Sequence, residues 1–262
     1  MSAAALATAP LERPRRSQFR MLLAQTRMNF VWYFWRDGEM IFWSLAIPVF
    51  FLVVFSFALG MGSAQRASAF LVPGLIAAQV FSSGFWGVGA MLATFREKKL
   101  LRRVYLTPLN PWTFFSALVL YRMTLLAMQA TLLILAGALV FKVHVVGNPF
   151  AVLGILALGA ATFVALGTVI GALVKTAESA NNFASVLTVP LSFLSDAYIP
   201  INNFPAPVAH ALRLLPSTQF VDAFRGIAIY GEPIWHYAGW MGALVLWMAG
   251  AIAVSARYFR WI

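Results

Sequence analysis

Residues 149–174, PFAVLGILALGAATFVALGTVIGALV, form an apolar run that contains no charged side chain. The hydrocarbon core of a bilayer is about 30 Å thick, and a helix needs roughly 20 apolar residues to cross it. The run exceeds that length and is rich in glycine and alanine. It therefore predicts a helix that spans a membrane.

Five further stretches carry the same apolar signal. They are residues 40–60, 69–94, 123–141, 183–198 and 235–256. In the second span, 69–94, Gly84, Gly87 and Gly89 are small residues that let helices approach closely in lipid. The chain is 61% hydrophobic and 10% charged, with a mean hydropathy of +0.81, whereas soluble domains are roughly 45–50% apolar and about 25% charged. We expect an all-α integral membrane protein with six transmembrane helices. This composition excludes a soluble enzyme.

Positive charge is concentrated between the apolar runs. The chain has 19 Lys and Arg against 8 Asp and Glu, a net charge of +11. Clustered cations can bind nucleic acid. Here, however, most cations fall in loops that would all lie on the same side of the membrane if the apolar runs cross it in turn. That pattern is typical of the cytoplasmic loops of membrane proteins. We therefore expect a multi-pass protein of the plasma (inner) membrane, with both termini cytoplasmic and no nucleic-acid partner.

Arg122 is the cation that this pattern does not assign to a loop. It directly precedes the run 123–141. An ionisable residue inside a span can mark a functional site, and a long side chain at a helix end can instead reach back to the interface. We expect Arg122 to lie at the cytoplasmic interface.

The chain lacks the motifs of the common catalytic sites. It has no cysteine, and its three histidines, His144, His210 and His236, are far apart in sequence. Lys175-Thr176 lacks the glycine that precedes the lysine of a phosphate-binding loop. We expect no metal or cofactor on this chain and no ATP hydrolysis by it alone, so any uphill transport takes its energy from a partner or an ion gradient.

The segments outside the spans divide the chain further. Residues 1–16 are expected to be a disordered basic N-terminus, and residues 17–37 an amphipathic helix in the cytoplasmic interface or an extension of the first span. Residues 38–262 then form the transmembrane domain. The stretch between residues 199 and 231 has four prolines with apolar residues at helical spacing between them. It predicts two short helices that pack on the outer face or dip into the membrane before the last span.

Residues 95–108, FREKKLLRRVYLTP, are the most informative polar segment. On a helical wheel, apolar residues such as Leu100 and Val104 share one side, while Lys99, Arg102 and Arg103 share the other. Two hypotheses follow from this amphipathic helix. It anchors the chain to anionic lipid, or it is a docking element for a cytosolic partner.

Three stretches of the chain resemble the permease subunits of ABC-2 type exporters, particularly the drug-resistance group typified by daunorubicin exporters. They are RDGEMIFWSLAIP at residues 36–48, REKKLLRRVYLTPLNP at residues 96–111, and the segment 200–226 with Asp222-x-x-Arg225. The resemblance implies an ABC-2 type transmembrane domain over residues 38–262, with an extracellular helical hairpin. It also implies a second permease subunit, identical or related, and two copies of a cytosolic ABC ATPase that binds ATP and Mg²⁺.

The resemblance also implies two groups of functional residues. Those expected to contact the ATPase are Arg96, Glu97, Lys98, Lys99, Leu100, Arg102, Arg103, Thr107, Pro108, Lys175 and Glu178. Those expected near an extracellular gate are Asp196, Pro205, Pro216, Asp222 and Arg225. Many relatives have Ser-Gly where this chain has Ser195-Asp196, so the sequence departs from the family at the gate.

Aromatic side chains in the second and fifth spans are candidates for the substrate pathway. They are Phe81, Phe85, Trp86, Phe183 and Phe193. Aromatic residues at helical spacing also pack against other helices or face lipid, so both roles stay open. Since the spans hold few charges, a lipophilic or amphipathic substrate is favoured.

Three classes of function fit these features. The first is the permease of an ATP-driven exporter, for drugs and lipid-like molecules or, as an alternative, for polysaccharide or lipid-linked glycan. The second is a membrane anchor that recruits a partner without transport. The third is a gradient-driven carrier, although such carriers usually place acidic residues or His inside their helices.

Overall fold

The computed structural model describes residues 18–36, 38–58, 64–99 and 111–258, and within these ranges it contains helices and no strand. The α-helices and their bounds are α1 (Gln18–Arg36), α2 (Gly38–Ala58), α3 (Ala64–Gly84), α4 (Met91–Glu97), α6 (Pro111–Phe141), α7 (Pro149–Leu173), α8 (Ala177–Leu194), α9 (Ala206–Arg213), α10 (Pro216–Ala228) and α11 (Ala238–Tyr258). A π-helix, η2 (Phe85–Ala90), joins α3 to α4, and two 3₁₀ helices are η3 (Ile201–Asn203) and η4 (Ile234–Tyr237). The expected all-α class is confirmed for these residues.

Four helices in the described ranges are long and apolar enough to cross a membrane. They are Arg66–Glu97, Ser116–Phe141, Pro149–Leu173 and Ile234–Tyr258. The apolar part of α2, Ala46–Ala58, is shorter. α8 begins with a polar turn that contains Glu178, Asn181 and Asn182. The protein is thus a multi-pass membrane protein, and the count of six spans stays a prediction.

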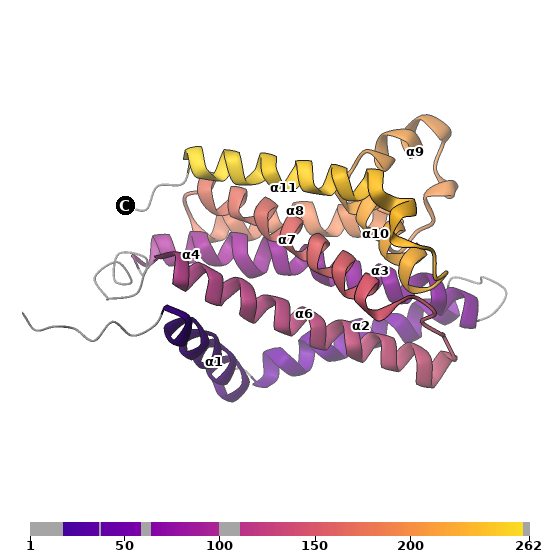
Figure 1. Cartoon of the computed structure of the whole chain (residues 1–262), viewed down its shortest axis with the longest axis horizontal. Coiled ribbons are helices and arrows are strands. Elements are labelled where there is room, and N and C mark those ends of the chain that lie inside the picture. Colours follow the sequence, from indigo (N-terminus) through magenta and orange to yellow (C-terminus); the bar gives the residue numbers. More distant parts are fainter. Residues whose placement is uncertain (1–17, 37, 59–63, 100–110, 259–262) are drawn as a thin grey trace, which may run out of the picture.

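The long helices lie side by side along one axis (Figure 1). α2, α3, α6, α7, α8 and α11 follow the long axis of the molecule, whereas α9 and α10 lie together at one extremity. α1, the last turn of α4 and the last turn of α11 lie at the opposite extremity. We call these two extremities the α10 end and the α4 end. The described stretch therefore begins and finishes at the α4 end.

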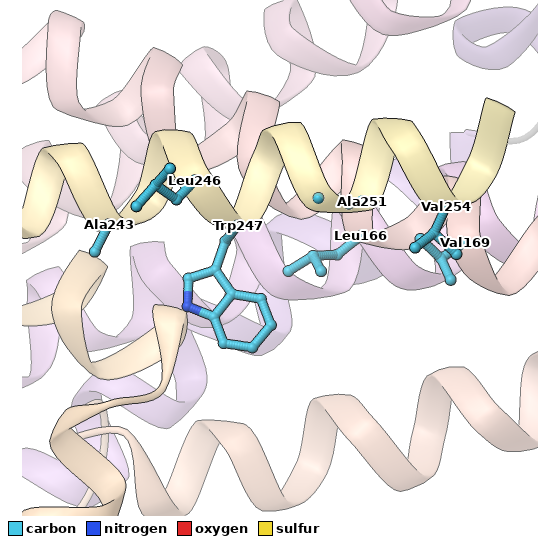
Figure 2. A pocket seen from close by; sticks show the side chains of 8 residues that line it. Leu166, Val169, Ala243, Leu246, Trp247, Ala251 and Val254 are labelled. Carbon is cyan, nitrogen blue, oxygen red and sulfur yellow. The ribbon is translucent and has the colours of Figure 1, made fainter. Parts of the chain in front are cut away.

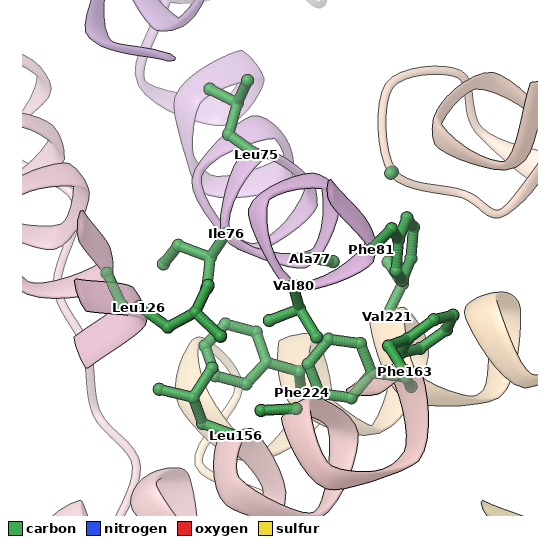
Figure 3. Packing of buried hydrophobic residues seen from close by; sticks show 14 of the residues in the cluster. Leu75, Ile76, Ala77, Val80, Phe81, Leu126, Leu156, Phe163, Val221 and Phe224 are labelled. Carbon is green, nitrogen blue, oxygen red and sulfur yellow. The ribbon is translucent and has the colours of Figure 1, made fainter. Parts of the chain in front are cut away.

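The helix α3 lies at the centre of the core. In the span Arg66–Glu97, 72% of the most apolar window is buried inside the protein, against 11% for Ile234–Tyr258. The ring of Phe81 packs on that of Phe163 of α7, with 4.5 Å between centroids, and Phe163 lies 6.2 Å from Phe220 of α10. Figure 3 shows part of this core, with side chains from α3, α6, α7 and α10 packed together.

Glycines bring α3 and η2 into backbone contact with α7. A Cβ atom on Gly167 would lie 2.0 Å from the carbonyl oxygen of Gly84, and one on Gly89 would lie 2.6 Å from the carbonyl oxygen of Gly167. Without a strong hydrophobic drive between helices in lipid, such close packing supplies much of their attraction. The expectation that small residues in the second span allow close approach is confirmed at Gly84 and Gly89.

Gly167→Ala is expected to lower the free energy of unfolding by about 1–3 kcal/mol, since its methyl group would overlap the Gly84 backbone. Thermal unfolding of the detergent-purified protein would measure the loss. Gly154→Ala is the matched control on the same helix, because a Cβ there meets nothing within 4 Å. Equal melting temperatures for the two variants would contradict the packing described here.

Candidate functional site

At the α4 end, two charged side chains join α4 to the turn between α7 and α8. The Arg96 guanidinium donates hydrogen bonds to the carbonyl oxygens of Ala172, at 3.3 Å, and Val174. The Glu97 carboxylate accepts a hydrogen bond of 2.5 Å from the backbone N–H of Ala177, the first residue of α8.

These contacts satisfy backbone groups that a helix leaves unpaired at its ends. The last carbonyls of α7 receive a cation, and the first amide of α8 receives an anion, the arrangement that helix dipoles favour. Thr176 caps α8 by accepting a hydrogen bond of 3.2 Å from the N–H of Ser179. We call this set of contacts the corner: Arg96, Glu97 and the α7–α8 turn 174–177.

The corner brings together the two segments that the sequence separately predicted to be cytoplasmic contacts of the ATPase. Lys98 and Lys99 follow directly and are exposed, and so are Lys175 and Glu178 on the other side. Leu100, Arg102, Arg103, Thr107 and Pro108 lie outside the described residues. Arg96 and Glu97 make contacts within the chain that the sequence did not indicate, and their contact with an ATPase stays a prediction.

At the α10 end, a buried ion pair joins the loop after α8 to α10. Arg225 of α10 is 5% exposed, and its guanidinium binds the side-chain carboxylate of Asp196 and also the Asp196 backbone carbonyl. A second carboxylate, Asp222, lies 3.8 Å from the same guanidinium. Three of the five predicted gate residues therefore form one cluster, which we call the outer clamp: Asp196, Asp222 and Arg225.

The outer clamp also holds α3. The guanidinium carbon of Arg225 lies 4.0 Å from the centre of the Phe70 ring, and Arg225 donates a 3.4 Å hydrogen bond to the Phe70 carbonyl. A Cβ atom on Gly74 would lie 1.8 Å from the carbonyl oxygen of Ala197, so the loop touches the α3 backbone. The outer clamp thus links α3, α8 and α10.

Asp196 adopts a backbone conformation that glycine favours. Its φ is +63°, in the left-handed region, which Asp tolerates better than most other residues. Its carboxylate also accepts a 2.6 Å hydrogen bond from the N–H of Ile201. The aspartate that departs from the family pattern thus fits this turn and supplies the partner of Arg225.

The remaining gate candidates have more local roles. Pro216 is buried in the first turn of α10, and Pro205 is exposed directly before α9. Asp222 lies outside the four spanning helices. Burial, and to a lesser extent the negative charge of Asp196, raises the pKa of the Asp222 carboxyl to about 7. The Arg225 guanidinium opposes this rise. The Arg225 guanidinium lies closer to Asp196 than to Asp222, so Arg225 pairs mainly with Asp196.

A groove of about 330 Å³ lies between α2, α3 and α8, reaching Trp86 at the start of η2. Its apolar wall contains Phe51, Phe55, Trp86, Phe193 and Tyr198. Its polar lining residues are Gln79, Ser82, Thr188 and Ser192. The Thr188 hydroxyl is buried and has no hydrogen-bond partner among the described residues. An apolar wall with a few polar groups is the usual character of a small-molecule site.

The structure divides the five aromatic pathway candidates. Trp86 and Phe193 line the groove, whereas Phe81 and Phe85 are at most 3% exposed and belong to the aromatic core. Phe183 is exposed on α8 and is not a lining residue of the groove. Packing, the alternative left open by the sequence, accounts for the positions of Phe81 and Phe85.

The side chain of Trp86 also ties η2 to the start of α8. Its indole N–H donates a 3.3 Å hydrogen bond to the carbonyl oxygen of Asn181. π-Helical turns are uncommon and occur frequently at functional sites. The sequence predicts one unbroken helix over residues 69–94 and gives no signal of this turn.

The side chain of Arg122 packs against η2, and its position relative to the membrane interface stays a prediction. The span Ser116–Phe141 includes this residue, and its guanidinium lies against Gly87, where a Cβ atom would be only 3.1 Å from the guanidinium carbon. One terminal nitrogen is 3.7 Å from the Met91 sulfur. Arg122 can pack there because Gly87 has no side chain.

Arg225→Gln is expected to lower the free energy of unfolding by about 3–5 kcal/mol, because it leaves the buried Asp196 carboxylate without its cation. Thermal unfolding in detergent, with protein yield as a second readout, would measure the effect. The control is Arg213→Gln at the same end, an exposed residue whose loss should cost less than about 0.5 kcal/mol. Equal losses of stability in Arg225→Gln and Arg213→Gln would show that the buried ion pair does not stabilise the fold.

Comparison with known proteins places the chain in a family. Residues 62–257 match the model of the family described as ABC-2 family transporter protein. Nodulation protein J of Rhizobium meliloti is 25% identical over 222 residues, covering 83% of this chain and 84% of that protein. YvfS of Bacillus subtilis, whose name contains the words transport permease, is 25% identical over 203 residues, covering 76% and 82%. The matched region contains the corner, the outer clamp and the part of the groove that α3, η2 and α8 line, whereas the lining residues of α2 precede it. The chain belongs to the ABC-2 family of transporter membrane proteins.

Proposed function

We propose that this chain is the permease subunit of an ATP-driven exporter, which moves a lipophilic or amphipathic substrate out of the cell. Family membership supports a transport permease. The groove supports the substrate class, because aromatic walls suit an apolar body and its few amide and hydroxyl groups suit a polar head. Two permease subunits work with two copies of an ABC ATPase, which bind ATP and Mg²⁺.

The distribution of charge supports an orientation with the α4 end in the cytoplasm of a cell bounded by the plasma (inner) membrane. Exposed cations at that end include Lys98, Lys99, Lys175 and Arg257. At the α10 end the exposed cations among the described residues are fewer, namely Arg66, Lys142 and Arg213, and Arg225 is buried in an ion pair. An excess of Lys and Arg marks cytoplasmic loops. Both chain ends then face the ATPase side, and the outer clamp faces the exterior.

The corner is the observation that carries the coupling mechanism. The ATPase contacts the cationic segment that continues from Lys98, and its movement on binding ATP reaches Arg96 and Glu97. Because these side chains bind the end of α7 and the start of α8, the push passes to α8, which forms one wall of the groove. Coupling of this kind requires an element with two positions whose balance depends on nucleotide, and α8 fills that role.

At the opposite end of α8, the outer clamp controls release. Asp196 follows α8 by two residues and is held by Arg225. A shift of α8 therefore moves Asp196 relative to Arg225. Separation of this ion pair opens the path outward. The substrate leaves between the two permease subunits.

Export of polysaccharide or lipid-linked glycan is the second candidate function. The relatives of this chain include proteins named for nodulation. In that case the lipid portion occupies the aromatic part of the groove, and Gln79 and Ser82 bind sugar hydroxyls. Vesicles that take up fluorescent lipid-linked oligosaccharide but not daunorubicin would favour this candidate.

Glu97→Gln is expected to lower ATP-dependent daunorubicin uptake into inverted vesicles by up to about tenfold, with the ATPase still bound. The neutral amide weakens the charge-assisted hydrogen bond to the first amide of α8. Asn182→Ala, an exposed residue of α8 outside the predicted ATPase contacts, is the control and should retain uptake. Full uptake by Glu97→Gln would show that the corner does not take part in coupling. Uptake that is abolished by an uncoupler but not by ATP depletion would refute ATP-driven export.

Phe193→Ala is expected to raise the apparent KM for daunorubicin several-fold, with a smaller change in maximal rate, because it removes one aromatic wall of the groove. Phe183→Ala is the control on the same helix, since Phe183 does not line the groove. The measurement is initial uptake rate against daunorubicin concentration. Equal KM values for the two variants would place the substrate path elsewhere.

A further inference from the structure

A second groove, of about 520 Å³, lies between α7 and α11 on another part of the molecule. It is lined only by apolar residues, two from α7 and six from α11: Leu166, Val169, Ala243, Leu246, Trp247, Gly250, Ala251 and Val254. Figure 2 shows Val169 and Val254 together at one end of the groove and Ala243 at the other, with the Trp247 ring projecting from α11 between them. The proposed export mechanism uses none of these residues.

The helices α7 and α11 run parallel, so both finish at the same end of the groove. We call this end the inner end. Thr162 of α7 hydrogen-bonds the carbonyl of Leu244, at 3.4 Å, and Thr168 hydrogen-bonds Ser255, at 2.8 Å. Residue numbers therefore rise together along α7 and α11, and both helices finish at the α4 end (Figure 1).

The length of the groove matches the depth of one bilayer leaflet. From Ala243 to Val254, α11 rises by roughly 16 Å at 1.5 Å per residue. One leaflet contributes about 15 Å of hydrocarbon, half of the bilayer core. A single acyl chain of the leaflet at the α4 end could thus lie along the whole groove.

A cation lies directly beyond the inner end of the groove. On α11, residues 243, 247, 250, 254 and 257 recur at the spacing of one helix face. The last of them is Arg257, which is exposed and follows Val254 by less than one turn. Lys175, two residues after α7 ends, is a second exposed cation at this end. An apolar channel with cations at its headgroup end is complementary to an anionic phospholipid.

The α11 surface is open to such a ligand. Only 11% of the most apolar window of Ile234–Tyr258 is buried inside the protein. A second copy of the chain related by a two-fold axis along the membrane normal would place its own Arg257 at the same depth and bring like charges together. Lipid covers this face without that repulsion.

We propose that the α7–α11 groove binds an anionic phospholipid of the cytoplasmic leaflet, with one acyl chain along Ala243–Val254 and its phosphate at Arg257. The assignment to this leaflet rests on the orientation proposed above. Binding of the lipid itself depends neither on the ATPase nor on the exported substrate. The two proposals therefore fail separately.

Native mass spectrometry of the delipidated full chain tests this site. The probes are phosphatidylglycerol and phosphatidylcholine with identical acyl chains. Phosphatidylglycerol is expected to bind more tightly, and Arg257→Gln to reduce its affinity about fivefold, the effect of about 1 kcal/mol for one cation near an anionic headgroup. Arg213→Gln, which removes an exposed cation at the other end, should leave the affinity unchanged.

Gly250→Leu tests the groove itself, and its expected effect is a loss of phosphatidylglycerol affinity of at least fivefold. A Cβ on Gly250 meets nothing within 4 Å, so the added side chain fills the groove without straining the fold. Gly242→Leu is the matched control, because Gly242 is equally open, lies on the same helix and does not line the groove.

Two results would overturn the proposal. One is equal phosphatidylglycerol affinity for Gly250→Leu and Gly242→Leu, or for Arg257→Gln and the parent chain. The other is an efficient disulfide between two copies of Ala243→Cys in membranes, which this cysteine-free chain allows to be read without background. That disulfide would show that a second copy covers the face.

Discussion

The contact of α3 and η2 with α7, backbone against backbone, is the constraint on which the other helix positions depend. Gly84, Gly89 and Gly167 leave no side chain between the two helices. The neighbouring rings of Phe81, Phe163 and Phe220 then close into one cluster, which also fixes α10. In lipid, where helices gain little from excluding water, such close contact and shared hydrogen bonds decide how a bundle packs.

Each end of the bundle is held by a charged side chain that binds backbone from another segment. Arg96 binds carbonyls at the end of α7, and Arg225 binds carbonyls of Phe70 and Asp196. Unpaired backbone groups are costly near hydrocarbon, and an arginine can reach several of them at once because its guanidinium has five donors. From the sequence, these charged residues are candidates for functional sites. In the structure, they stabilise contacts within the chain.

The helix α8 connects these two ends. It begins at the corner, where Glu97 binds its first amide, and it is followed by Asp196 of the outer clamp. Along its length it faces the groove between α2 and α3, and Trp86 of the π-helix binds its second turn. An element tied at both ends and bordering a groove is well suited to carry movement from one side of the membrane to the other.

The sequence alone determined the membrane class, the apolar segments, the absence of a phosphate-binding loop and the family resemblance, because these depend on composition and local order. Only the tertiary structure decided which charges pair and which aromatic residues face a groove. Asp196 and Arg225 are 29 positions apart in the sequence. Phe81 and Trp86 are both aromatic residues of the same predicted span, yet Phe81 is in the core and Trp86 lines the groove. Arg122 packs against η2 because Gly87, on another helix, leaves room for it. Such outcomes depend on the space between helices, and local periodicity carries no information about that space.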